Sequence, residues 1–546
     1  MMGGPQVHVM NQQVQRETGR KAQLSNIAAG KAVSDIIRTT LGPRSMLKMI
    51  LDPMGGIVMT NDGNSILREV DVSHPAAKSM IELSRAQEEE VGDGTTSVVI
   101  LASELLKRAN ELVKNSIHPT SIMAGYRLAM KESVKFIKSH VATKTDKLGR
   151  EVGFNIAKTT LSSKIFGRES EFFANLAVDA MTMVKSESAE SGKTTYPIKS
   201  VGIIKQHGKS FKDSQLINGY VMYGGRAGQG MPRTIKGAKI ALLDIDLRKA
   251  KMVMGVQVVV TDPKKLEDIR QREADITKER IQLLLKAGAN VIFTTKGIDD
   301  MAIKYFVEAG ALAVRRVKKE DLRRIAKLTG GTMMITLADM DGNETFTPEM
   351  LGVADEVIEE RIADDDHIII KGGHNTRACS VLLRGANMHM LDEVERSLHD
   401  ALCAIKRALE SASVVPGGGC VEAALSIHLE NFATSLASRE QLAIAEFAQS
   451  LLVIPKQLAV NAAQDASEMV AKLRASHNAA QTDPSKSDMK HVGMDCISGK
   501  IQDNLAAGII EPALSKVKMI QFATEASITV LRIDDMIKLA PEEQGQ

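Results

Sequence analysis

The spacing of apolar residues divides the chain into two helical ends and a mixed middle. Up to about residue 144, runs such as 24–41, 73–91 and 98–114 place apolar side chains three and four residues apart. This is the period of an amphipathic helix. Residues 45–67 differ, because two short apolar runs separated by tight-turn residues predict a β-hairpin. From about residue 390 to 531 the helical period returns.

The middle of the chain follows another pattern. Between residues 239 and 371, short strand-like runs alternate with helical segments, which predicts a compact α/β domain. Within it, twelve of the nineteen residues from 262 to 280 are charged. A helix this polar is not buried. It is either an ordinary solvated helix or, together with the strongly apolar run 251–260 before it, a projecting adhesive arm.

This order of patterns favours an inserted middle. The simplest arrangement is one helical domain built from both ends of the chain, with the middle inserted as two further domains. The insertion is expected to cross two hinge strands, near residues 144–149 and 402–409.

Composition narrows the class of protein. A chain of 546 residues is too long for a single hydrophobic core, so several domains are expected. Its net charge of +3, with the two signs interspersed, gives no indication of a nucleic-acid or membrane partner. Aromatic residues make up 3% and Trp is absent, which argues against base-stacking surfaces. The four cysteines are far apart and form no metal or disulfide pattern. No apolar run approaches the length of a membrane span and the first twenty residues lack a signal core, so a cytosolic location is expected.

The motif with the most chemistry is VGDGTTS at 91–97, directly before the helix at 98–114. A helix that begins on Gly-Asp-Gly-Thr-Thr-Ser offers unpaired N–H groups and the positive end of its dipole to an anion such as phosphate. Asp93 would repel phosphates unless a divalent cation lay between them, and Mg²⁺ commonly takes one or two carboxylates plus phosphate oxygens. The alternative is a plain turn followed by a Thr/Ser N-cap.

Other loops carry weaker signals. Three glycines at 417–419 let a backbone pass close to a ligand, although alone they mark only a turn. Asp62, in an Asn-Asp-Gly turn, is typical of a structural residue when taken singly. Asp364, Asp365 and Asp366 fit a solvated turn better than a metal site. Two segments that resemble the end of a phosphate-binding loop, at 192–194 and 208–210, lack its leading glycine.

Several motifs occur in a fixed order along the chain: LGP at 41–43, TNDG at 60–63, VGDGTTS at 91–97, ERSLHDAL at 395–402, VPGGG at 415–419 and GIIEP at 508–512. On these motifs the chain resembles the group II chaperonins across essentially its whole length. It resembles subunits of the eukaryotic cytosolic chaperonin TRiC, the TCP-1 ring complex. From about residue 103 the similarity is to the alpha subunit, and in about the first 100 residues it is to the gamma subunit.

The resemblance implies a multidomain α and α/β fold with three chaperonin domains. A helical equatorial ATPase domain would comprise 1–148 and 405–546. A small intermediate domain would comprise 149–220 and 372–404. An α/β apical domain that binds clients would span 221–371, with a helical lid protrusion at about 248–282.

The resemblance also implies roles for individual residues. ATP or ADP would be bound by Gly42, Pro43, Gly94, Thr95, Thr96, Ser97, Lys164, Gly418, Asp495 and Glu511. Among these, Gly418 would lie on the base side, Glu511 would bind the ribose and Lys164 would sense the γ-phosphate. Asp93 would bind Mg²⁺, Asp400 would position the attacking water and Asp62 would assist it.

The function implied is an ATP-dependent molecular chaperone subunit in the cytoplasm. Its partners would be paralogous subunits in a double-ring hetero-oligomer and unfolded clients, actin and tubulin among them. One alternative is a ring subunit that acts mainly as a scaffold and hydrolyses ATP weakly. Another is an ATP-dependent enzyme for a small molecule, although the α/β middle shows no cluster of His, Cys or Lys that would form its site.

Overall fold

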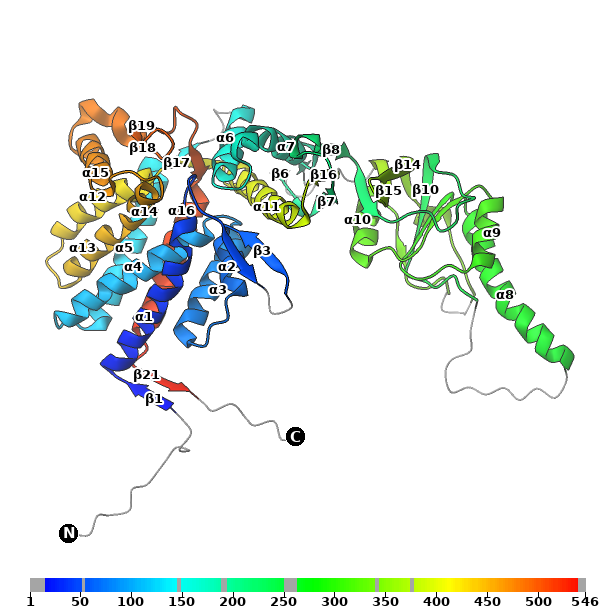
Figure 1. Ribbon diagram of the computed structural model, residues 1–546, viewed down its shortest axis with the longest axis horizontal. Coiled ribbons are helices and arrows are strands. Elements are labelled where there is room, and N and C mark those ends of the chain that lie inside the picture. Colours follow the sequence, from blue (N-terminus) through cyan, green and yellow to red (C-terminus); the bar gives the residue numbers. More distant parts are fainter. Residues whose placement is uncertain are drawn as a thin grey trace, which may run out of the picture. The chain divides into compact units, whose positions relative to one another are not determined.

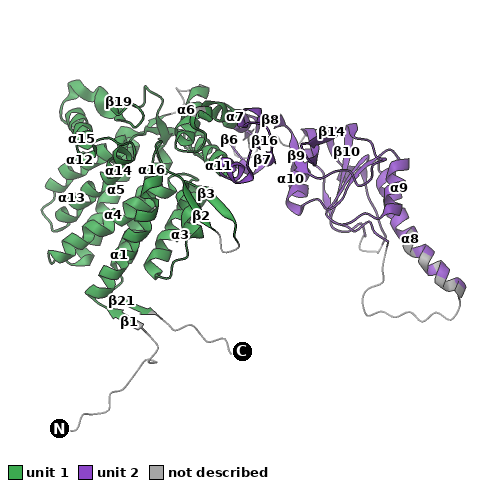
Figure 2. Cartoon of the chain, in the orientation of Figure 1, with its two compact units in different colours: residues 1–178, 396–546 green, residues 179–395 purple. Residues whose placement is uncertain are grey.

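The computed structural model describes residues 15–51, 55–144, 149–187, 194–249, 263–338, 343–373 and 378–538. They form two compact units, one made of Met1–Val178 with Arg396–Gln546 and the other of Asp179–Glu395 (Figure 2). The chain leaves unit 1 within helix α7 (Ser170–Met183) and returns within α11 (Met388–Ser411). The two ends therefore share one unit and the middle is inserted.

Unit 1 is mainly helical, as the apolar period predicted (Figure 1). Its N-terminal half contributes α1 (Arg20–Ile37), α2 (Gly63–Glu69), α3 (Pro75–Glu90), α4 (Thr95–Lys114), α5 (Pro119–Phe136) and α6 (Gly149–Ser162). Its C-terminal half contributes α12 (Cys420–Thr434), α13 (Glu440–Leu451), α14 (Val453–Asn461), α15 (Ala466–Thr482) and α16 (Ala513–Leu531).

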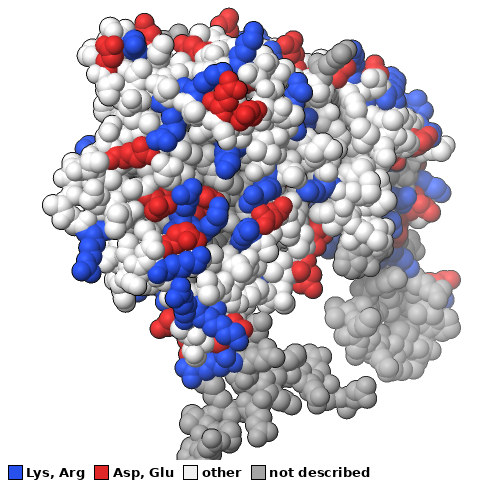
Figure 3. Space-filling view, turned by 60° about the vertical axis from the view of Figure 1, so that its left-hand side comes forward, with Lys and Arg blue, Asp and Glu red and all other residues white. Residues whose placement is uncertain are grey.

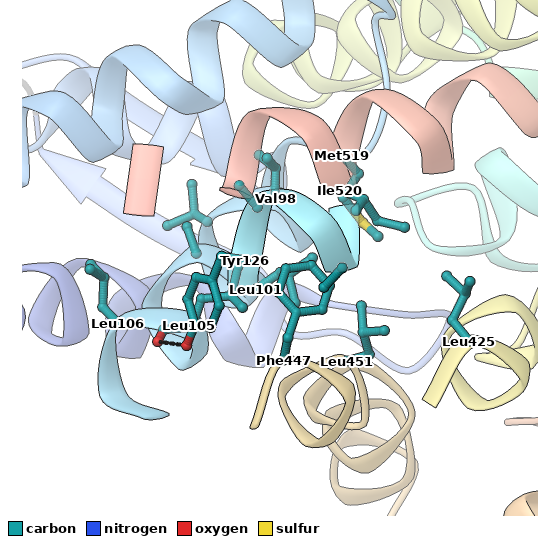
Figure 4. Close-up of a cluster of buried hydrophobic side chains, with 14 of the residues drawn as sticks. Val98, Leu101, Leu105, Leu106, Tyr126, Leu425, Phe447, Leu451, Met519 and Ile520 are labelled. Carbon is teal, nitrogen blue, oxygen red and sulfur yellow. Dashed lines mark hydrogen bonds between the residues drawn. The ribbon is translucent and has the colours of Figure 1, made fainter. Parts of the chain in front are cut away.

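Helix α4 lies at the centre of unit 1. It contacts α1, α3 and α5 from the first half and α13 and α16 from the second. Leu101 and Leu105 are fully buried among Phe447 of α13 and Ile520 of α16 (Figure 4). The Tyr126 hydroxyl donates to the Leu105 carbonyl at 2.9 Å, which satisfies the one polar atom of that ring. The core therefore needs both ends of the chain.

Short strands complete unit 1. The predicted hairpin is present as β2 (Lys48–Leu51) and β3 (Ile57–Thr60). Strand β1 (Gln15–Thr18) pairs antiparallel with β21 (Asp535–Lys538). A three-stranded sheet has the order β20 (Ile510–Pro512), β17 (Ser413–Pro416), β4 (Thr143–Lys144). Strands β18 (Val492–Asp495) and β19 (Lys500–Asp503) form a hairpin.

Unit 2 is the predicted α/β region. Its main sheet has the order β12 (Leu312–Val314), β11 (Val291–Thr294), β10 (Thr234–Leu243), β14 (Gly352–Ile362), β15 (Asp365–Gly373), β9 (Tyr220–Tyr223), and β13 (Met333–Met334) also pairs with β10. Strands β10, β11 and β12 are parallel, and β14, β15 and β9 extend the sheet antiparallel. Helices α8 (Pro263–Lys286), α9 (Asp300–Glu308) and α10 (Lys319–Thr329) alternate with the strands. A smaller sheet joins β7 (Val201–His207), β16 (Cys379–Gly385) and β8 (Gln215–Asn218).

Two expectations need correction. Residues 402–409 are not a hinge strand, because they lie inside α11, whose apolar side chains such as Leu402 and Ile405 are buried at helical spacing. The stretch Glu440–Asn461 is long and apolar enough to cross a membrane, contrary to the estimate from the sequence. Half of its most apolar window is buried, and Ile444 and Phe447 belong to the core of unit 1, so it is a core segment.

Two further predictions concern the charged segment 262–280 and the apolar run before it. The charged segment 262–280 is helical from Pro263 onward, as part of α8. The apolar run 251–260, and with it part of the lid protrusion expected at 248–282, lies outside the described residues. Acidic and basic side chains are interspersed on the face shown in Figure 3, in keeping with the small net charge.

Candidate functional site

The loop before α4 has the backbone that its glycines predicted. Gly92 and Gly94 have φ angles of 81° and 82°, in the left-handed region that favours glycine. Gly94 is the N-cap of α4, and no side chain within the described residues caps this helix. The Thr95 hydroxyl donates instead to Asp62. The Thr/Ser N-cap alternative is therefore wrong, since Gly94 occupies the cap position and no hydroxyl among the described residues caps this helix.

A cavity of about 80 Å³ opens at this helix end. Its lining brings together residues that are more than 300 positions apart in the chain. The lining residues are Thr40, Leu41, Gly42, Asn61, Asp62, Gly92, Asp93, Gly94, Thr95, Thr96, Ser97, Ser163, Lys164 and Asp400.

One lysine and three carboxylates dominate the chemistry of this cavity. Lys164 Nζ lies 2.7 Å from Asp400 Oδ2, with both side chains about nine-tenths buried. Asp62 Oδ1 accepts from Thr95 Oγ1 at 2.9 Å, and its Oδ2 accepts from the Ser65 N–H at 2.9 Å. Asp62 therefore caps α2, which confirms its structural role, and also faces the cavity.

The carboxylates have different proton affinities because their surroundings differ. Burial raises the pKa of Asp400 well above its ordinary value, and Lys164 only partly opposes this. Burial also raises the pKa of Asp93, against the charge of Lys164 and the hydrogen bond from the Gly94 N–H. For Asp62, burial acts in the same direction, but Lys164 and the hydrogen bonds from Ser65 and Thr95 outweigh it and lower the pKa.

A fourth carboxylate, Glu88 of α3, belongs to the same electrostatic group. Burial and the charge of Asp62 raise the pKa of Glu88 to about 7. Glu88 does not line the cavity, and nothing in the motifs drew attention to it.

A second cavity of about 280 Å³ continues from the first. The two cavities have lining residues in common, among them Gly42, Asp93 and Gly94. The lining of the second cavity comes from both halves of unit 1. The further lining residues include Pro43, Asn155, Lys158, Thr159, Thr160, Ser162, Gly418, Gly419, Ile454, Leu458, Met494, Asp495, Cys496, Ile497, Gly508, Ile509, Glu511, Ser515, Lys516 and Met519.

The three-glycine loop forms part of this wall. Gly418 has a φ of 67°, and a Cβ there would lie 2.3 Å from the Met494 carbonyl oxygen and 2.4 Å from Asn504 Nδ2. Asn504 Nδ2 donates to the Gly417 carbonyl at 2.9 Å, and the Met494 N–H donates to the Gly418 carbonyl at 2.9 Å. Glycine is therefore required for the loop to approach the β18 strand.

Every site residue proposed from the sequence lines one of the two cavities, and Asp93 and Gly418 line the same one. Sequence reasoning missed Asn61, which was taken as part of a turn, and the polar face of α6 from Asn155 to Ser162. It also missed Lys516, which the sequence does not distinguish from the nearby Lys518 of the same helix.

The donor set fits a metal bound jointly by protein and nucleotide. No cluster of three or more His, Cys, Asp or Glu side chains that could bind a metal occurs in the described parts of the chain. Asp93 places one carboxylate beside the uncapped start of α4, where phosphate oxygens could supply other ligands. This suits Mg²⁺, which keeps waters and phosphate oxygens, better than a metal that needs an all-protein site.

Comparisons with known proteins find a matching family model and several similar proteins. A model of the TCP-1/cpn60 chaperonin family matches residues 33–541. The chain is 61% identical to T-complex protein 1 subunit alpha of Arabidopsis thaliana, over 97% of both chains. It is 55% identical to the protein of the same name from Dictyostelium discoideum, over 97% of this chain and 96% of the other.

Similarity extends to a more distant relative. A thermosome subunit of Pyrococcus horikoshii is 39% identical over the whole of this chain and 97% of its own. The alignment with the Arabidopsis alpha subunit covers so much of the chain that it includes most of the first hundred residues. The gamma-like character of that part stays a prediction.

Proposed function

The chain belongs to the TCP-1/cpn60 chaperonin family, and from this premise we propose that it works as an ATP-dependent chaperonin subunit in the cytosol. It binds and hydrolyses ATP, assembles with paralogous subunits into a hetero-oligomeric ring and folds client proteins. Actin and tubulin as clients stay a prediction from the resemblance.

One observation carries the proposal. Asp93 and Gly418 come from the N-terminal and C-terminal segments of unit 1, yet both line the cavity at the uncapped start of α4. A helix N-terminus with glycine-rich backbone on two sides is suited to a nucleotide, because N–H groups and the helix dipole favour phosphate.

We propose the following division of labour within the site. The first turn of α4, from Gly94 to Ser97, binds phosphates together with Gly42 and Pro43. Gly418 and Asp495 lie on the base side and Glu511 binds the ribose. Asp93 would bind Mg²⁺, which spreads the charge that develops on the phosphates.

Hydrolysis then depends on residues that handle the attacking water. Asp400 orients the water and Asp62 assists it. Lys164, which pairs with Asp400 at 2.7 Å, is the cation available to the terminal phosphate. Phosphoryl transfer needs positioning and charge stabilisation more than covalent chemistry, and these side chains can supply both.

The proposal includes the three-domain organisation. Unit 1 contains the whole of the proposed equatorial domain, and unit 2 contains the proposed apical domain at 221–371. Asp400 lies on α11, the helix through which the chain returns to unit 1. A change in α11 during domain closure would therefore alter the position of Asp400, and hydrolysis would be timed by closure.

The test is ATP turnover by the assembled protein, with and without an unfolded client, together with its native mass. A mass near that of a double ring and turnover that responds to the client are expected. A scaffold subunit would assemble but hydrolyse ATP weakly. An enzyme acting on a small molecule would show neither the ring mass nor the client response, and either result would contradict the proposal.

A further inference from the structure

A buried ion triad borders the second cavity. Lys516, in the first turn of α16, places its Nζ 2.8 Å from Glu422 Oε1 and 2.9 Å from Glu511 Oε2. The side chains of Lys516 and Glu422 are 7% and 1% exposed, and that of Glu511 is 26% exposed. Three charges from α12, β20 and α16 therefore meet in the interior, one of them open to the cavity.

Such a triad is expensive to bury. Removing charges from water is strongly unfavourable, and replacing a buried ion pair by apolar residues of similar volume often leaves a protein equally stable. The attraction between the ions returns part of this cost only while all three remain paired. The arrangement therefore suggests a role besides stability.

The three residues of the triad differ in whether they line the cavity. Lys516 and Glu511 line the cavity, whereas Glu422 does not. The second oxygen of Glu422, Oε2, is buried without a hydrogen-bond partner among the described residues. Glu422 therefore serves mainly as a counter-charge for Lys516.

Lys516 binds one of the two carboxylate oxygens of Glu511. Glu511 Oε2 is bound by Lys516, and Oε1 lies on the side of the glycine loop, 2.9 Å from where a Cβ of residue 417 would be. Burial raises the pKa of Glu511, and the charge of Lys516 opposes this. Lys516 thus favours a charged Glu511 with a defined orientation.

We propose that Lys516 is a positioning residue for nucleotide binding. It holds Glu511 so that Oε1 accepts hydrogen bonds from the ribose hydroxyls. Glu422 supplies a second negative charge that offsets the unfavourable burial of the Lys516 charge. This inference rests on the proposed function, in which Glu511 binds the ribose. It assigns to Lys516 an effect on affinity for the sugar, with no part in the hydrolytic step.

The experiment compares two ligands by titration calorimetry on the full-length protein with Mg²⁺ present. One is ADP and the other is 2′,3′-dideoxy-ADP, which lacks the ribose hydroxyls. The unaltered protein is expected to bind ADP about tenfold more tightly than 2′,3′-dideoxy-ADP, because ADP can donate hydrogen bonds from its ribose hydroxyls to a charged acceptor. Glu511→Ala and Lys516→Met should each bring this ratio close to one, and the double variant should lose no more than either single variant.

Two further variants separate positioning from general damage. Lys516→Arg keeps the charge and should restore at least part of the preference. Glu422→Gln removes a buried charge but keeps the Lys516–Glu511 pair, so it should lower thermal stability and retain the preference for ADP.

Several results would overturn the inference. A normal ligand ratio in Lys516→Met, additive losses in the double variant, or an equal loss of preference in Glu422→Gln would each show that Lys516 does not act through Glu511. Failure of the unaltered protein to bind ADP would contradict the proposed function as well, so the two failures are distinguishable.

Discussion

At the scale of single residues, side chains of one chemical type differ because their neighbours differ. Asp62 and Asp400 both face the first cavity. Hydrogen bonds and Lys164 hold the pKa of Asp62 down, whereas burial dominates for Asp400 and raises its pKa. This divergence is a common feature of sites in which two carboxylates have separate tasks.

The proposed role of Asp400 is tested by Asp400→Ala. Removing the carboxylate that orients the water should leave ATP binding within about threefold and reduce turnover by about a hundredfold or more. A single-turnover assay on assembled protein measures the hydrolytic step alone. Near-normal hydrolysis in that assay would refute the assignment.

The proposed role of Asp93 predicts a different defect. Asp93→Ala should weaken nucleotide retention in the presence of Mg²⁺ by about tenfold or more, because one ligand of the cation is lost. Retention without Mg²⁺ should change far less. Equal losses with and without the cation would argue that Asp93 acts only by shaping the loop.

Glu88 gives a prediction about pH. In the unfolded chain its carboxyl loses the proton near pH 4.5, but in the folded protein its pKa is about 7. The folded state therefore binds this proton more tightly, and its stability falls as pH rises from 4.5 to 7. Glu88→Gln removes this penalty and should stabilise the protein by about 1 kcal/mol at pH 8, after allowance for solvent screening.

The measurement is the free energy of unfolding in urea at pH 5 and pH 8. The advantage of Glu88→Gln should nearly vanish at the lower pH. Glu82→Gln, on the exposed face of the same helix, controls for the loss of a surface carboxylate. A variant that is less stable than the original protein at pH 8 would contradict the prediction.

At the scale of elements, glycines decide how closely α11 approaches the loop before α4. A Cβ at Gly92 would lie 2.3 Å from Cys403 Cβ, and Cys403 is one turn beyond Asp400 on α11. The contact therefore connects the position of the loop to the position of the carboxylate. The sequence marked the loop by its glycines, but the partner helix came from a segment about 300 residues later.

Gly92→Ala should consequently impair both stability and turnover. Part of the cost, about 1 kcal/mol, comes from placing a Cβ at a positive φ. Gly55→Ala is the matched control, because Gly55 has a φ of 85° but nothing within 4 Å of the new Cβ. Thermal melting should show the backbone cost in both variants. A turnover assay should show a loss only in Gly92→Ala. Normal turnover in Gly92→Ala would show that α11 does not depend on this contact.

At the scale of the whole molecule, each unit has its own core. In unit 2, Ile240 and Phe293 are buried on one face of the main sheet, and Ala241 and Ile292 are buried on the other. In unit 1, the core around α4 includes side chains from both ends of the chain. The two units should therefore differ in whether one continuous segment can fold alone.

A fragment of residues 179–395 should fold by itself and melt cooperatively, without binding ATP. A fragment of residues 1–178 should not fold stably, because α12, α13 and α16 are missing from its core. Circular dichroism during heating measures both. Addition of a 396–546 fragment should restore structure and nucleotide binding, and cooperative melting of 1–178 alone would contradict this.

Much of the fold follows from the local sequence. The periods of apolar residues predicted the helices of unit 1, the β2–β3 hairpin and the α/β middle, because these patterns depend on residues within one or two turns of each other. They failed at residues 402–409, where a hinge strand was expected inside a continuous helix. The return of the chain to unit 1 occurs within α11, so no break in the pattern marks it.

The sequence by itself determined that α4 begins on a glycine-rich turn, which is the basis for proposing an anion there, because backbone geometry and the helix dipole are local properties. Only the tertiary structure decided which distant residues complete the site. The pairing of Lys164 with Asp400, the burial of Lys516 between two glutamates and the raised pKa of Glu88 all depend on neighbours from other elements. Burial and charge act through space, and the order of residues along the chain does not specify those distances.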